Sequence, residues 1–213
     1  MKKSIKIRVG VPSYSGRTFP RTAETIQALS SFPDIVFDTV IVPGMSINLA
    51  RNVAVSGSKR KLFQKHNFDY FLSVDADVSF SVSSVLMLID RDVDVVAAAY
   101  NQRSSITGEL CPRLTCGKWN RFPGDIRASD FLDTKTTGLV EVDTVGLGCT
   151  LIKKRVFELL EYPYFRENIV VHDDEALLLA DDLSFSLNCQ RRGIRLYCDA
   201  DVRAAHDAGN EYR

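Results

Sequence analysis

Short apolar runs alternate with helical segments through the first hundred residues, and this alternation limits the folds open to the chain. Apolar strands are expected at 6–12 (KIRVGVP), 37–43 (FDTVIVP), 68–74 (FDYFLSV) and 93–100 (VDVVAAAY). The spacing of apolar residues predicts helices between them, at 22–32, 46–57 and 82–89. Thr22 is the expected N-cap of the first helix, and Gly57 the residue that closes the second. This order predicts an α/β fold in which crossover helices flank a mostly parallel central sheet.

The pattern breaks down between residues 102 and 137, in a stretch that contains the only tryptophan, Trp119. We expect an irregular segment there, and long irregular segments in compact domains are usually functional. Regular structure is expected again in VEVDTVGLGCTLIKKRVFELL, as a strand, a glycine turn, a strand and a helix. A helix in DDLSFSLNCQRRG, ending at Gly193, and a last strand with a tail ending in His206 complete the chain.

Charge and cysteine content exclude several classes of protein. Lys+Arg and Asp+Glu both number 27, so there is no overall attraction to nucleic acid. The one basic segment, 58–65 (SKRKLFQK), is expected to be a solvated helix end. No apolar run is long enough for a membrane span, and no signal peptide is apparent. Five irregularly spaced cysteines argue against a disulfide framework, and we expect a cytoplasmic protein.

Two carboxylates, Asp75 and Asp77, follow a buried strand in FLSVDADVSF. Ligands on parallel sheets bind beyond the carboxyl ends of the strands, which here are 12–14, 43–45 and 75–77. If the backbone stays extended, both acids project to one side and suit a divalent cation that prefers oxygen ligands. The alternative is that the two aspartates only cap the helix near Val82.

A second acidic pair, Asp181 and Asp182, opens the late helix. Two adjacent acids raise one another's pKa, which suits a general base, although helix capping explains them equally simply. A further acidic cluster at 172–175 (HDDE) is expected to belong to a mobile loop on the acceptor side.

Five segments in order resemble the GT-A glycosyltransferases of the family-2 type. They are VPSY, SINLARN, VDADV, DTVGLGCTLIKKRVFELL and ADDLSFSLNCQRRGIRLYCDADVRAAH, and they extend over nearly the whole chain. The resemblance implies a single Rossmann-like GT-A domain with a small antiparallel element near the active site. It also implies a nucleotide-binding half at residues 1–100 and an acceptor-binding and catalytic half at residues 101–213.

On the donor side, the resemblance makes VDADV a DxD motif that binds a UDP-sugar. It implies Asp77 as the principal metal ligand and His206 as the second, with Mn²⁺ or Mg²⁺ as the cation. Asp75 would contact the ribose and frame the metal site, with Ala76 between the two acids. The residues expected to border the nucleotide are Pro12, Ser13, Tyr14 and Arg51. The alternatives are a surface arginine for Arg51 and a stray tail residue for His206.

On the acceptor side, the resemblance implies that Asp182, beside Asp181, is the general base of an inverting reaction. The turn Gly146-Leu147-Gly148 and Trp119 would shape the sugar and acceptor pockets, although Trp119 could equally be a core residue. The acceptor would be a glycan or glycoprotein. A retaining reaction needs no base, so the stereochemical outcome stays open.

Two departures from the family pattern are visible. The acidic pair is Asp-Asp where many relatives have Glu-Asp, and the Gln-x-x-Arg-Trp motif of processive synthases is absent, so a single transfer is expected. The chain also resembles the N-terminal transferase domains of capsid-glycosylating proteins from large DNA viruses of algae. That resemblance implies a longer parent chain with further domains, acting in the host cytoplasm.

Three other functions remain open from the sequence. DADVS approaches the motif of haloacid dehalogenase phosphatases, in which the first aspartate is a nucleophile, but their Gly-Asp-x-x-x-Asp motif is absent. SYSGRTFPRT is a faint match to the glycine-rich loop of sugar-phosphate nucleotidyltransferases. A non-catalytic sugar-binding domain is the third alternative, and it predicts that Asp75 and Asp77 are dispensable for ligand binding.

Overall fold

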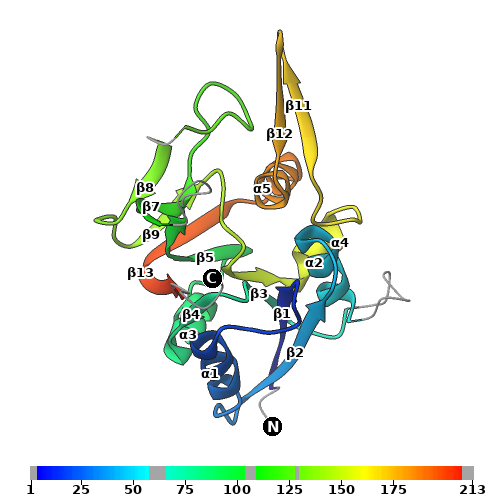
Figure 1. The fold of residues 1–213 in the computed structure, drawn as a ribbon, viewed down its shortest axis with the longest axis vertical. Coiled ribbons are helices and arrows are strands. Elements are labelled where there is room, and N and C mark those ends of the chain that lie inside the picture. Colours follow the sequence, from blue (N-terminus) through cyan, green and yellow to red (C-terminus); the bar gives the residue numbers. More distant parts are fainter. Residues whose placement is uncertain (1–3, 58–65, 104–108, 128–129, 208–213) are drawn as a thin grey trace.

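An eight-stranded sheet forms the centre of the computed structural model (Figure 1). Its strands lie in the order β2 (Ile35–Pro43), β1 (Ile5–Ser13), β3 (Tyr70–Val74), β10 (Cys149–Lys153), β5 (Val95–Ala99), β13 (Leu196–His206) and β4 (Val78–Phe80), and β9 (Leu139–Val142) also pairs with β13. β2, β1, β3, β5 and β13 run in the same direction, whereas β10, β9 and β4 run against them. The expected α/β fold with a mostly parallel central sheet is confirmed.

Helices cover both faces of this sheet, because each inner strand is apolar on both sides (Figure 1). α1 (Pro20–Leu29) and α3 (Val82–Asp90) pack on one face, and α2 (Ile47–Ser56), α4 (Lys154–Leu159) and α5 (Asp181–Arg191) pack on the other. Successive residues of β3 alternate between the two cores: Phe71 packs under α2 and α4, and Leu72 packs under α1 and α3. Both side chains are fully buried.

The small antiparallel element that the resemblance implied is confirmed, and the described residues contain two such elements. β6 (Asn101–Arg103), β7 (Leu110–Gly117) and β8 (Phe131–Asp133) form a small sheet, so the expectation for 102–137 was partly wrong. Register shifts in both strand pairs explain why no regular alternation appears in the sequence. β11 (Asn168–His172) and β12 (Glu175–Leu179) form a hairpin that projects from the body (Figure 1). The acidic cluster at 172–175 forms the tip of that hairpin, and its place in a mobile loop on the acceptor side stays a prediction.

The N-caps of α1 and α3 differ from those considered in the sequence analysis. α1 begins at Pro20 with Phe19 as its N-cap, so Thr22 is not a cap and lies fully buried in the helix. The side chain of Ser81 caps α3 by accepting a hydrogen bond from the Ser84 amide, which leaves no capping role there for the two aspartates of the DxD motif. α2 ends as expected, because Gly57 adopts a left-handed conformation with φ of 71°.

The structure describes residues 4–57, 66–103, 109–127 and 130–207. The basic segment at 58–65 lies outside these residues. Within them, none of the helices combines the length and the apolar character that crossing a membrane requires.

Gly10 allows α2 to approach β1 closely. A Cβ atom at this position would lie 2.4 Å from the ring of Phe71 and 2.8 Å from the Cβ of Ala54. We therefore expect Gly10→Ala to lower the free energy of unfolding by about 1–3 kcal/mol, as overpacked cores do. Urea denaturation measures the change.

The Phe71→Leu background supplies the control. Because Leu has no ring at that distance, the same Gly10→Ala substitution is expected to destabilise this background less, giving a non-zero coupling energy. Additive effects of the two substitutions would contradict the packing explanation.

Candidate active site

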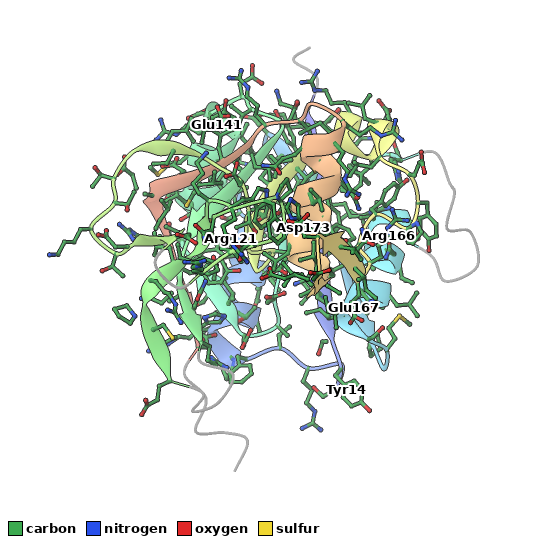
Figure 2. The ribbon with its side chains drawn as sticks, turned by 90° about the horizontal axis from the view of Figure 1, so that it is seen from above. Tyr14, Arg121, Glu141, Arg166, Glu167 and Asp173 are labelled. Carbon is green, nitrogen blue, oxygen red and sulfur yellow. The ribbon has the colours of Figure 1, made fainter. Side chains whose placement is uncertain are left out.

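A pocket of about 540 Å³ opens where β1 and β3 end. Its lining joins five separate parts of the sequence: the end of β1 with the loop after it, the start of α2, the DxD motif, the end of β6 and the end of β13. The lining residues are Pro12, Ser13, Tyr14, Ser15, Arg17, Phe19, Ile47, Asp75, Ala76, Asp77, Arg103 and His206. Tyr14 lies at the edge of the molecule with its side chain directed outward, 85% exposed (Figure 2). A ligand therefore reaches this pocket without any rearrangement of the core.

The DxD motif forms a tight turn between β3 and β4. The Val78 amide donates to the carbonyl of Asp75 at 3.1 Å, and the Phe19 amide donates to the carbonyl of Ala76 at 2.9 Å. The extended backbone assumed from the sequence is therefore absent. Because the chain reverses here, Asp75 and Asp77 meet different partners instead of projecting together. Ala76 contributes its backbone, which fixes the loop that follows β1.

Asp75 belongs to a buried ion-pair network centred on Arg51. The guanidinium donates to Asp75 Oδ1 at 2.6 Å and, through its other terminal nitrogen, to Asp181 Oδ2. The Arg51 side chain is only 4% exposed, so it is not a surface residue, and it reaches the pocket only through Asp75. Burial acts to lower the pKa of Arg51, but the charges of Asp75 and Asp181 outweigh burial and raise it. The network thus links the end of β3 to the start of α5.

Asp77, in the turn before β4, and His206, at the end of β13, both line the pocket. His206 is paired with Val78 across the β4–β13 ladder, and the Asp207 amide donates to the carbonyl of Asp77 at 2.7 Å. His206 Nδ1 lies 2.8 Å from the carbonyl of Asn101, which can only accept, so Nδ1 is the donor in this contact and Nε2 is the nitrogen that would be available to a metal ion. His206 is therefore an ordered strand residue and not a stray tail histidine.

These two side chains fit a divalent cation that takes its remaining ligands from a substrate. A carboxylate and a neutral imidazole, its other nitrogen held by a carbonyl, form a donor set suited to Mn²⁺. In the described part of the chain, no three His, Cys, Asp or Glu side chains gather into a metal site. The expected third ligand, Asp75, has one carboxylate oxygen bonded to Arg51.

Asp207, next to His206, was not foreseen from the sequence. Its buried carboxylate accepts hydrogen bonds from the Thr22 amide and hydroxyl at 3.1 and 3.0 Å, and from the Ser79 hydroxyl at 2.8 Å. These bonds attach the end of β13 to α1 and β4, and so hold His206 beside the DxD turn. The sequence gives one sign of this role, which is the position of the aspartate directly after His206, the candidate metal ligand. Its partners lie 185 and 128 residues away, where no local pattern identifies them.

The acidic pair begins α5, as expected, but the two carboxylates differ. Asp181 is bound to Arg51, whereas Asp182 Oδ1 accepts only from the adjacent Leu183 amide, at 2.8 Å. Burial, followed by the charge of Asp181, raises the pKa of Asp182 to about 6. Asp182 is therefore the carboxylate in this pair that suits proton transfer near neutral pH.

The other predicted substrate residues lie outside the lining of the pocket. Gly148 packs beneath it: its amide donates to the Tyr100 hydroxyl at 2.8 Å, and a Cβ there would lie 2.9 Å from Asp75 Oδ2. Gly146 packs against Thr115 and Tyr100, and Leu147 is a core residue, 2% exposed.

Trp119 lies in the segment after β7 and contacts the C-terminal end of α5, whereas the acidic pair is at the start of that helix. It is half-buried, and its indole nitrogen donates to Gln190 Oε1 at 2.7 Å. A substrate role for Trp119 therefore stays a prediction.

Removal of Arg51 leaves two carboxylates in a buried site without their cation. We expect Arg51→Met to lower the free energy of unfolding by about 3–5 kcal/mol. The matched control is Arg195→Met, because the exposed Arg195–Glu141 pair at 3.5 Å contributes at most about 1 kcal/mol. Chemical denaturation at pH 7 compares the two variants, and equal effects would contradict a structural role for the buried network.

Comparison with known proteins identifies a fold and no family. No protein-family model and no curated protein matches the sequence. Among solved structures, A197 from STIV is similar over 95% of this chain and 85% of that chain, with 17% identity and a TM-score of 0.59.

Two glycosyltransferase structures are similar as well. GalNAc-T7, crystallised with UDP, GalNAc and Mn²⁺, matches 96% of this chain, which spans 44% of that one, with 12% identity and a TM-score of 0.57. The catalytic domain of Drosophila β1,4-galactosyltransferase 7, in complex with xylobiose, matches 98% of this chain and 73% of that one, with 12% identity and a TM-score of 0.52. The chain therefore has a single-domain GT-A-like fold.

Proposed function

We propose that the protein is a metal-dependent, non-processive glycosyltransferase that moves a sugar from a nucleotide-diphosphate donor, a UDP-sugar, to a glycan or glycoprotein acceptor. The observation that carries this proposal is the pocket in which Asp77 and His206 face the loop after β1. In the GT-A-like fold this pocket lies at the carboxyl edge of the sheet, where α/β proteins bind their ligands. The structure of GalNAc-T7 with UDP, GalNAc and Mn²⁺ is consistent with such a ligand set in this fold.

Donor binding is assigned to the first half of the chain, residues 1–100, together with the end of β13. Pro12, Ser13 and Tyr14 border the nucleoside, and Asp75, held by Arg51, accepts a ribose hydroxyl. Asp77 and His206 would hold Mn²⁺ or Mg²⁺, and the cation would supply positive charge to neutralise the diphosphate leaving group. Asp207 and Asn101 keep His206 in position for this task.

Acceptor activation is assigned to α5, in the second half of the chain, residues 101–213. Asp182 accepts the proton of the acceptor hydroxyl as that hydroxyl attacks the sugar, which gives an inverting reaction. Asp181 is bound to Arg51, and so it positions the first turn of α5 and does not itself transfer a proton. The raised pKa of Asp182, about 6, supports this division of roles.

Two of the alternatives have little support from the geometry. A phosphatase nucleophile at Asp75 needs a free carboxylate, but Asp75 Oδ1 is bound to a buried arginine. A non-catalytic sugar-binding domain gives no reason for a carboxylate of raised pKa beside the site. From the sequence resemblance, we further propose that the protein glycosylates a viral capsid and that it is part of a longer chain.

Calorimetry with UDP tests the donor site. We expect UDP to bind in the presence of Mn²⁺ and to bind at least about tenfold more weakly without it, because the diphosphate charge is then not neutralised. Asp77→Ala is expected to remove the Mn²⁺-dependent part of the affinity. Asp34→Ala, which removes an exposed carboxylate outside the pocket, is the matched control and is expected to bind as the parent does. Undiminished metal-dependent binding in Asp77→Ala would refute the proposed metal site.

The pH dependence of transfer tests the base. Asp182 must be ionised to accept a proton, so the rate is expected to rise with pH up to about 6 and then level off. Below that pH the rate should fall about tenfold per unit. Asp182→Asn is expected to lower kcat by about 10²–10⁴-fold. The measurement is donor turnover between pH 4.5 and 8 at saturating Mn²⁺, so that loss of metal is not mistaken for loss of the base. Full activity of Asp182→Asn would exclude this role.

A further inference from the structure

Arg103 is a cation in the proposed donor pocket to which neither the sequence nor the fold assigns a role. It ends β6, its side chain is 31% exposed, and it lines the pocket. One terminal nitrogen donates to Asp77 Oδ2 at 3.1 Å, and the other donates to the carbonyl of Asp207 at 3.0 Å. The guanidinium thus contacts the carboxylate that is proposed to bind the divalent cation.

We infer that Arg103 is a diphosphate-binding residue that occupies Asp77 in the free protein and moves to the donor phosphates when a divalent cation binds Asp77. This inference rests on the proposed function, because it requires a diphosphate and a cation in this pocket. It adds a second positive group to the donor site and explains how the pocket neutralises Asp77 before the cation arrives.

Among the described residues, Arg51 and Arg103 contact the DxD motif. The geometry indicates that Arg103 is the one that can leave its carboxylate. Its bond to Asp77 is longer than the 2.7–2.9 Å common for charged pairs, and both side chains are more than a quarter exposed. Such pairs contribute little to stability, so exchange of the partner is easy. Arg51, by contrast, is 4% exposed and is bound to two carboxylates, which fixes it in place.

The position of Arg103 also suits a phosphate ligand. Its bond to the Asp207 carbonyl keeps the guanidinium at the pocket wall when the bond to Asp77 is lost. A planar guanidinium then presents free donors to phosphate oxygens, for which it is well matched. Because a cation on Asp77 and a guanidinium on the same carboxylate repel one another, the binding of the cation itself drives the exchange.

This arrangement predicts effects of opposite sign for two ligands. Arg103 competes with a cation that binds alone, but it assists a nucleotide diphosphate that binds together with the cation. We expect Arg103→Met to tighten Mn²⁺ binding in the absence of nucleotide by about threefold, in line with the weakness of a half-exposed pair. The same substitution is expected to weaken UDP binding at saturating Mn²⁺ by about tenfold, through loss of a charged hydrogen bond to phosphate. Binding of uridine, which has no phosphate, should not change.

Isothermal titration of the folded chain with Mn²⁺, with uridine, and with UDP plus Mn²⁺ measures all three effects. Arg113→Met is the matched control, because Arg113 lies on the neighbouring strand, is bonded to Gln102 and is outside the pocket lining. Its three affinities should equal those of the parent. Arg103→Gln repeats the test with a polar side chain, should the methionine variant fail to fold.

The outcomes separate this inference from the function on which it rests. Absence of Mn²⁺-dependent UDP binding in the parent protein would overturn the proposed function and this inference with it. If the parent binds UDP, weaker binding of both Mn²⁺ and UDP in the Arg103 variants would overturn this inference alone, as would unchanged affinities. Opposite shifts for the two ligands, with uridine unaffected, would support it.

Discussion

The buried contact of Arg51 with Asp75 and Asp181 is the interaction on which the rest of the site depends. It joins a carboxylate at the end of β3 to one in the first turn of α5, so two segments far apart in sequence share one cation. Neither carboxylate could be buried there alone, because an uncompensated charge in a protein interior is strongly destabilising. The same cation lies close enough to Asp182 to limit the rise in its pKa. One buried arginine outside the pocket lining therefore positions both Asp75 at the pocket and Asp181 at the start of α5.

The DxD turn shows how a short motif separates two functions. Both aspartates line the pocket, but because the chain reverses between β3 and β4, Asp75 is bound to the buried Arg51 and Asp77 to the partly exposed Arg103. The two residues have the same chemistry and lie two positions apart, yet one has an immobile arginine partner and the other a partially exposed one. The sequence correctly identified the pair as a feature of the sheet edge, but the assumption of an extended backbone gave the wrong relation between the two side chains.

What the sequence predicts well here is what local periodicity encodes. The buried strands, the glycine that ends α2 and the acidic start of α5 follow from patterns within a dozen residues. A small antiparallel element was expected from the resemblance, but the strands of the three-stranded sheet could not be located because their pairing is irregular. The β11–β12 hairpin could not be located because its strands are short and largely exposed. Asp207 and Arg103 were missed for another reason: their roles come from contacts between distant segments, which no local pattern records. The proximity of Asp77 and His206 was anticipated only through a resemblance, since it depends on the pairing of β4 with β13.

The place of β10 in the sheet has a consequence for how the chain is made. β10 lies between β3 and β5, β13 covers the far side of β5, and β9 pairs with β13, so three strands of the second half complete a sheet begun by the first. A nascent chain that ends near residue 100 would leave the apolar strands β3 and β5 unpaired at adjoining edges, which is a state prone to aggregation. Completion of the sheet therefore awaits synthesis of β10 and β13. The proposed nucleotide pocket, which includes His206 near the end of β13, is complete only once that strand has been made.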